Sequence, residues 1–146
     1  MKTLSFSDCA FDGLIAFNVI HHTSMAGMRR PLSGMRRVLR RPEPAEGRPG
    51  GRLYFTAVAS EEGNSASYRT DVEAGKCREI EPFTFVYLRD APGGKYLHHH
   101  YCDEAELRAL LAGFAVDDLR LVREEYAGED GVIHVGAHYH VQARRL

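Results

Sequence analysis

The pattern of apolar residues predicts two buried strands in the first sixty residues. One unbroken apolar stretch runs from Gly13 to Ile20, and a second runs from Arg52 to Ala59. A strand that is apolar on both faces is typical of the centre of a covered parallel sheet, with other strands on each side. Almost no sequence precedes the first stretch, so we expect one of its neighbouring strands to come from outside these residues.

A helix is predicted between these two strands. Apolar residues recur at three- and four-residue steps, whereas the arginines of the segment fall mainly on the opposite surface; the apolar positions are Met28, Leu32, Met35 and Leu39. Pro31 fits best in the first turn, because a proline inside a helix costs about 3 kcal/mol, so we expect the helix to cover about 31–40. Two strands joined by one crossover helix should be parallel, with a right-handed connection.

The carboxyl-terminal third predicts a helix and then a hairpin. Asp103, with Glu106 three positions later, is typical of a capped helix that ends near Gly113. Two strands are expected over 116–125 and 132–143, and the turn-rich residues between them require antiparallel pairing. In the middle of the chain, 60–76 is polar and is expected to be a mobile cover or loop.

Several short motifs follow one another in an order that resembles a known family. They comprise an acidic loop, the end of a strand, the end of a helix and a tight turn: Leu4, Phe6, Asp8, Phe11 and Asp12; Asn18, His21 and His22; Arg37, Val38 and Leu39; Pro49, Gly50 and Gly51. In this order they resemble the second half of a class I S-adenosylmethionine-dependent methyltransferase of the type that modifies small molecules. Ser5 stands where that family usually has proline.

The resemblance implies an α/β fold, namely the carboxyl-terminal half of a Rossmann-like methyltransferase sheet. Two parallel strands joined by a crossover helix would be followed by a helix and a terminal antiparallel hairpin. We expect a single partial domain over 1–146. Its parts would be an acidic loop, strand, helix and strand in 1–59, a cover or substrate segment in 60–101, and the helix and hairpin in 102–146.

Two elements of that family have no counterpart in this sequence. They are the glycine-rich loop after the first strand, which lets the backbone approach the cofactor, and the acidic residue that binds the ribose hydroxyls. Most of the pocket for S-adenosylmethionine is therefore missing. We expect a truncated chain that is inactive alone, and the sequence leaves open whether Met1 is the true start.

The resemblance also suggests candidate site residues. Leu4, Phe6, Asn18 and Val19 would contact S-adenosylmethionine. His21 and His22 follow a central strand, where ligands of open α/β sheets bind, and either could act as a general base; the alternative is that one ring caps the next turn and the other packs. His98, His100 and Tyr101 are the candidates for binding the substrate.

Histidines near the carboxyl terminus raise the question of a metal. His134, His138 and His140 would share one face of a strand, and imidazoles two residues apart can chelate a divalent ion. Half-exposed polar histidines on an edge strand are the commoner case, so we expect no metal site. A metal-binding protein remains the weakest of three hypotheses.

The composition of the chain gives no support for nucleic-acid or membrane partners. The 146 residues are 44% hydrophobic and carry a formal net charge of −1, which suits one folded domain and gives no electrostatic argument for nucleic acid. The three cysteines, at widely spaced positions, suggest neither a disulfide framework nor a zinc site, which favours a reducing cytoplasm. No stretch is long and apolar enough to cross a membrane.

Two functional hypotheses stand ahead of metal binding. The first is a methyltransferase, or part of one, that acts on a small-molecule methyl acceptor. The second is a non-catalytic interaction module derived from such an enzyme. In the second case the exposed edge of the first strand would be covered by a second copy in a homodimer, or by a separate amino-terminal half.

Overall fold

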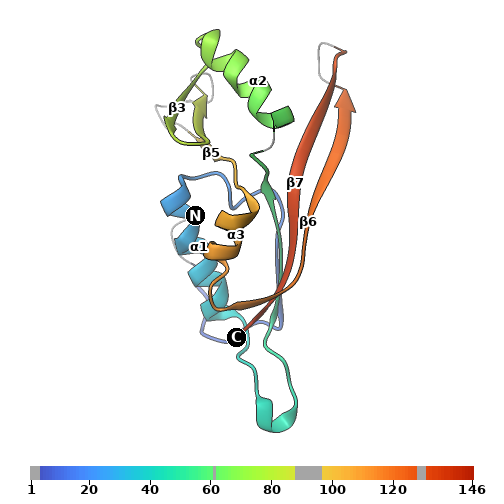
Figure 1. The fold of residues 1–146 in the computed structure, drawn as a ribbon. Helices are drawn as coiled ribbons and strands as arrows, with labels where there is room; N and C mark the ends of the chain where they lie inside the picture. The colour runs from blue at the N-terminus through green and yellow to red at the C-terminus, as the bar shows by residue number, and fades with distance from the viewer. Residues whose placement is uncertain (1–3, 61, 88–96, 128–130) are drawn as a thin grey trace.

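The computed structural model of this protein describes residues 4–60, 62–87, 97–127 and 131–146. Four strands form the main sheet in the order β1-β2-β7-β6 (Figure 1). β1 (Gly13–Ala16) and β2 (Arg52–Val58) are parallel, and β7 (Ile133–Arg145) is antiparallel to both β2 and β6 (Phe114–Ala127). The expected order of strands, with a parallel pair followed by an antiparallel hairpin, is confirmed.

The crossover helix α1 (Met25–Val38) begins six residues earlier than expected. Its amino-terminal cap is Ser24, whose side-chain oxygen accepts a hydrogen bond from the Gly27 N–H. Pro31 consequently lies inside the helix rather than in its first turn, which corrects the expectation, and its buried ring packs with the apolar stripe. Capping and burial of that stripe outweigh the cost of one missing helical hydrogen bond.

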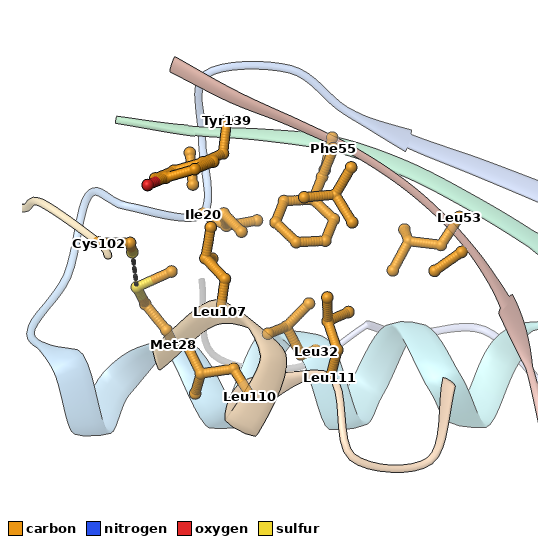
Figure 2. Close-up of a cluster of buried hydrophobic side chains, with 14 of the residues drawn as sticks. Ile20, Met28, Leu32, Leu53, Phe55, Cys102, Leu107, Leu110, Leu111 and Tyr139 are labelled. Carbon is orange, nitrogen blue, oxygen red and sulfur yellow. Dashed lines mark hydrogen bonds between the residues drawn. The ribbon is translucent and has the colours of Figure 1, made fainter. Parts of the chain in front are cut away.

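The hydrophobic core lies between the sheet and two helices, α1 and the short α3 (Glu104–Leu110) (Figure 1). Asp103 caps α3 as predicted, its carboxylate accepting from the Glu106 N–H. Figure 2 shows Phe55 and Leu53 of the sheet facing Leu32, Leu107 and Leu111 of the helix side. The apolar stripe of α1 predicted from the sequence is buried.

The Pro49-Gly50-Gly51 turn has a steric explanation. A Cβ atom on Gly50 would collide with the carbonyl group of Arg145, at the end of β7. Only glycine allows the chain entering β2 to pass this close to the neighbouring backbone. The turn therefore fixes the register at the start of β2, where the Arg145 N–H also donates to the Gly51 carbonyl.

β1 is shorter than the apolar stretch that predicted it, and it lies at the rim of the sheet rather than in the middle. Leu14 and Ala16 point into the core, whereas Ile15 on the opposite face is 78% exposed. Within the described ranges, β2 is its one neighbouring strand. A segment whose apolar pattern is typical of a central strand therefore has apolar side chains exposed to solvent here. Asn18 then takes a left-handed conformation (φ 51°) and ends the extended backbone.

β7 is an interior strand with β2 on one side and β6 on the other, which corrects the expectation of an edge strand for its histidines. Tyr139 and Val141 face the core, and His138 and His140 face the other side of the sheet. The His134 side chain lies outside the described part of the structure.

A second, three-stranded sheet and a helix follow β2 at one end of the main sheet (Figure 1). The sheet contains β3 (Cys77–Glu81), β4 (Thr84–Tyr87) and β5 (His98–His100), and the helix is α2 (Glu62–Glu73). The polar segment 60–76 is therefore mostly helical, not a loop. The prediction failed because α2 lacks a strong apolar stripe, and its end is fixed by a tertiary bond from the Tyr87 hydroxyl to Asp71.

Candidate functional site

The carboxyl ends of β1 and β2 are joined through two side chains. The Asn18 N–H donates to the Thr56 hydroxyl oxygen at 2.9 Å, and that hydroxyl donates to the Asn18 side-chain oxygen at 2.8 Å. Asparagine tolerates the left-handed conformation better than most residues, so this clamp suits its position. It leaves Phe17 and Val19 on either side of Asn18 exposed at 58% and 50%.

Three imidazoles lie together just beyond this clamp, and we call His21, His22 and His99 the histidine cluster. The ring centroids of His21 and His22 are 4.4 Å apart, and those of His22 and His99 are 4.9 Å apart. β5 brings His99 here because the His100 N–H donates to the His21 carbonyl oxygen at 2.9 Å. The fold thus joins the segment expected to be catalytic to the segment expected to bind substrate.

The environment of His21 makes its imidazole a weak base. Its side chain is 4% exposed, and burial, followed by the neighbouring His22, His99, His138 and His100, lowers its pKa to about 3. The Nδ1 atoms of His21 and His22 are buried without a hydrogen-bond partner within the described structure. Because an unsatisfied buried polar atom costs about 1–3 kcal/mol, these two atoms are suited to receive a polar group of a ligand.

The His100 and Tyr101 side chains have other partners. The His100 ring is 3% exposed and bonds the Thr84 hydroxyl through Nδ1 (2.6 Å) and the Glu106 carboxylate through Nε2 (3.0 Å). Tyr101 is buried against Tyr68 and Phe85 in the second core cluster. His98 is half-buried on β5. The strand pattern placed His98 and His100 on one face, but the sequence held no signal that His99 would be the residue facing His22.

The residues of the acidic loop lie farther along the sheet. Leu4 packs against the core, and its side chain lies where a Cβ atom on Gly34 of α1 would be in van der Waals contact with it. Phe6 is exposed, with its ring edge-to-face against Phe11 at 4.9 Å. The loop is held by Arg37, whose guanidinium donates to the carbonyls of Leu4 and Phe6 and to Asp8. Sequence reasoning missed this role for Arg37, which it had placed on the outer helix surface.

The face of the main sheet opposite α1 and α3 carries a wide concavity of about 810 Å³. It extends over the open sides of β1, β2 and β7 and includes Ile15, Tyr54 and Gln142. At its rim Arg144 forms an ion pair with Asp117 (2.7 Å), which holds the pKa of that carboxyl below its usual value. Periodicity could not predict this concavity, because it lies on the face of the sheet over which the described part of the chain places no second layer (Figure 1).

Potential metal ligands also gather around His100. One ligand atom each from His100, Cys102 and Glu106 lies within 4.8 Å of the others. Burial, with the charges of Glu106 and Asp103, raises the pKa of the Cys102 thiol, which donates to the Met28 sulfur at 3.7 Å (Figure 2). A protonated thiol and a closed imidazole–carboxylate bond suit a packed hydrogen-bonded group better than a metal ligand set. On β7, His140 bonds the Tyr54 hydroxyl instead of sharing a ligand geometry with His138.

Comparison with known proteins finds similarity at the level of structure. No protein-family profile matches the sequence, and no curated protein sequence matches it. Among solved structures, a SAM-dependent methyltransferase from Methanosarcina mazei is 21% identical with a TM-score of 0.67, and the alignment covers 99% of this chain and 64% of that one. A putative methyltransferase from Bacillus halodurans is 15% identical with a TM-score of 0.62, over 98% and 68%.

A third similar structure is the 1,6-didemethyltoxoflavin-N1-methyltransferase of Burkholderia thailandensis, solved with 1,6-didemethyltoxoflavin and S-adenosylhomocysteine bound. It is 18% identical with a TM-score of 0.51, over 96% of this chain and 46% of that one. This chain therefore spans about half to two thirds of the length of these structures. The described residues have the fold of class I S-adenosylmethionine-dependent methyltransferases, and they form part of it. None of the described helices is long and apolar enough to span a membrane.

Proposed function

We propose that these residues are part of an S-adenosylmethionine-dependent methyltransferase that acts on a small molecule. The observation that carries the proposal is the fold, whose sheet order is β1-β2-β7-β6. This fold aligns over 98–99% of the chain with structures described as methyltransferases. The motif order seen in the sequence gives independent support, because it was found without the structure. A fold alone does not determine the reaction, so the activity must be inferred from the residues of the site.

Residues near the end of β1 fit one side of such a cofactor. Phe17 and Val19 offer exposed apolar surface beside the Asn18–Thr56 clamp, and the buried Nδ1 atoms of His21 and His22 have no hydrogen-bond partner among the described residues. The sequence has no glycine-rich loop after a strand and no acidic residue for the ribose. We therefore propose that the 146 residues alone do not hold S-adenosylmethionine, and that a glycine-rich half completes the pocket beside β1.

The chemistry demands little of the protein's side chains. When bound, S-adenosylmethionine supplies an electrophilic methyl group on a sulfonium. The protein's part is to hold the acceptor in line with that methyl group, and such positioning supplies several kcal/mol. If the acceptor must lose a proton, His22 is the better candidate for the base, because His21, with a pKa of about 3, can accept a hydrogen bond but takes up a proton poorly near neutral pH.

Isothermal calorimetry with S-adenosylmethionine tests this proposal. We expect no binding to the 146-residue chain and micromolar or tighter binding to a chain extended upstream by a glycine-rich half. His22→Gln in the extended chain should keep cofactor binding and lower the rate of methyl transfer. Tight binding of the cofactor by the 146-residue chain would refute the proposed division of the pocket.

The exposed edge of β1 favours a second candidate, an interaction module. Ile15, Phe17 and Val19 together leave apolar surface uncovered at an open sheet edge, and burying each is worth about 1.5–3 kcal/mol. A second copy or a separate amino-terminal half would cover it by strand addition. Sedimentation equilibrium discriminates: concentration-dependent association that Ile15→Lys abolishes would support the module, and a monomer at all concentrations would oppose it.

Cell location is also part of the proposal. Cys9, Cys77 and Cys102 are all free thiols. Burial raises the pKa of the Cys77 thiol, as it does that of Cys102, so neither buried thiol is activated. Three unpaired cysteines are compatible with a reducing cytoplasm.

A further inference from the structure

A chain of hydrogen bonds, buried at Thr84 and His100, connects the small sheet to both helices of the main core. The Glu81 carboxylate accepts from the Met25 N–H at the start of α1 (2.8 Å) and from the Thr84 hydroxyl (3.0 Å). Thr84 bonds His100, and His100 bonds Glu106 on α3. Thr84 and His100 are both buried, so each missing bond would leave an unsatisfied polar atom.

This chain of hydrogen bonds determines how β5 lies against the segment that follows β1. The His100 ring is anchored on one side of the strand by Thr84 and Glu106, and its backbone N–H holds the His21 carbonyl. Neighbouring residues of a strand point to opposite faces, so anchoring His100 on one face directs His99 to the other. There the His99 ring lies edge-to-face against His22, with an interplanar angle of 85°.

We infer that His100 is a positioning residue: through Thr84 and Glu106 it sets the geometry of the histidine cluster and does not itself contact substrate. Both ring nitrogens are already hydrogen-bonded, and the ring is almost completely enclosed, so a ligand could reach it only by breaking this network. Fixed ring geometry matters because a base displaced by a fraction of an ångström loses much of its effect. The relevance of this ring geometry to methyl transfer rests on the proposed function. The anchoring of the rings by His100 does not depend on that function.

NMR of the uniformly isotope-labelled 146-residue chain tests the inference directly, without cofactor or activity. In His100→Phe, which removes both ring bonds, we expect the ring signals of His21, His22 and His99 to shift. The amide of residue 100 should also exchange with solvent about tenfold faster, as expected for weakened local structure. Signals of Val141, in the distant core, should stay in place. Glu106→Leu should reproduce these changes by removing one bond.

Two matched variants separate positioning from general stability. Glu106→Gln keeps an acceptor for the His100 Nε2–H and should restore the wild-type ring signals. His98→Gln alters the same strand outside the network and should leave them unchanged. Unshifted ring signals in a folded His100→Phe would overturn the inference. Global unfolding of Glu106→Leu would overturn it too, because the network would then hold the fold rather than the histidines. Failure of cofactor binding in the extended chain would leave these outcomes untouched.

Discussion

The two faces of the main sheet differ more than any other two regions of this molecule. On one face Leu53, Phe55 and Val141 pack against α1 and α3 and are fully buried. On the other face no helix covers β1 and β2 among the described residues, and Ile15 is mostly exposed (Figure 1). Both faces have apolar side chains at the β1–β2 end of the sheet, but one layer of helices is present and the other is not.

The difference shows where the described residues leave apolar surface uncovered. Parallel strands are normally covered on both faces, and an open face beside an open edge is costly. Thr56 is the exception that connects the two regions: it belongs to the open face, yet Asn18 covers it and buries it. The carboxyl end of the strands is therefore ordered on both sides, and this is where the histidine cluster lies.

The sharpest test of this contrast is to truncate one side chain on each face. Phe55→Ala should lower the free energy of unfolding by about 3–5 kcal/mol, because it leaves a cavity in the packed core. Ile15→Ala should change it by less than about 0.5 kcal/mol in the 146-residue chain, because the side chain already meets solvent. Urea unfolding followed by circular dichroism measures both. Equal losses would mean that the open face is covered, for example by a second copy.

Breaking the Asn18–Thr56 clamp should lower the free energy of unfolding by an intermediate amount. Thr56→Val removes the hydroxyl that bonds Asn18 twice but keeps the volume, so we expect a loss of about 1–2 kcal/mol. Thr56→Ser keeps the hydroxyl and should lose less. Unfolding free energies of the two variants, measured side by side, check this. If valine proves as stable as threonine, the clamp contributes nothing to stability.

The last expected effect is a dependence of the free energy of unfolding on pH. The His21 pKa is lowered to about 3 in the folded chain, whereas in the unfolded chain the imidazole titrates near 6.5. The unfolded state therefore binds the proton more tightly, so stability is fully present above pH 6.5 and falls as the pH drops toward 3. Between pH 7.5 and 5.5 this one group should remove about 1 kcal/mol. His138, whose pKa burial also lowers, acts in the same direction.

Unfolding measurements at several pH values check this dependence. His21→Gln should flatten the slope between pH 7.5 and 5.5, whatever it does to absolute stability. An unchanged slope in His21→Gln would show that His21 is not a buried neutral imidazole.

Local patterns in the sequence predicted much of the fold. The apolar stripe of α1, the Asp103 cap and the β6–β7 pairing all depend on residues close in the chain or on a periodicity that a few residues display. The expected helix start was wrong because a good cap at Ser24 and burial of Pro31 outweighed the local penalty of proline. The helix α2 was missed because its apolar pattern is weak and its partner, Tyr87, is distant in the sequence.

By itself the sequence determined the class of fold and pointed to the end of β1 as the place for chemistry. Only the tertiary structure decided which histidines meet there, because the contact between His22 and His99 joins segments 77 residues apart and depends on how His100 is anchored. An open edge at β1 was expected from the sequence, but only the structure decided that Leu14 packs against the core while Ile15 lies on the exposed face. The periodicity of apolar residues predicts which side chains should be buried, but only the packing of the layers against one another determines which of them are buried.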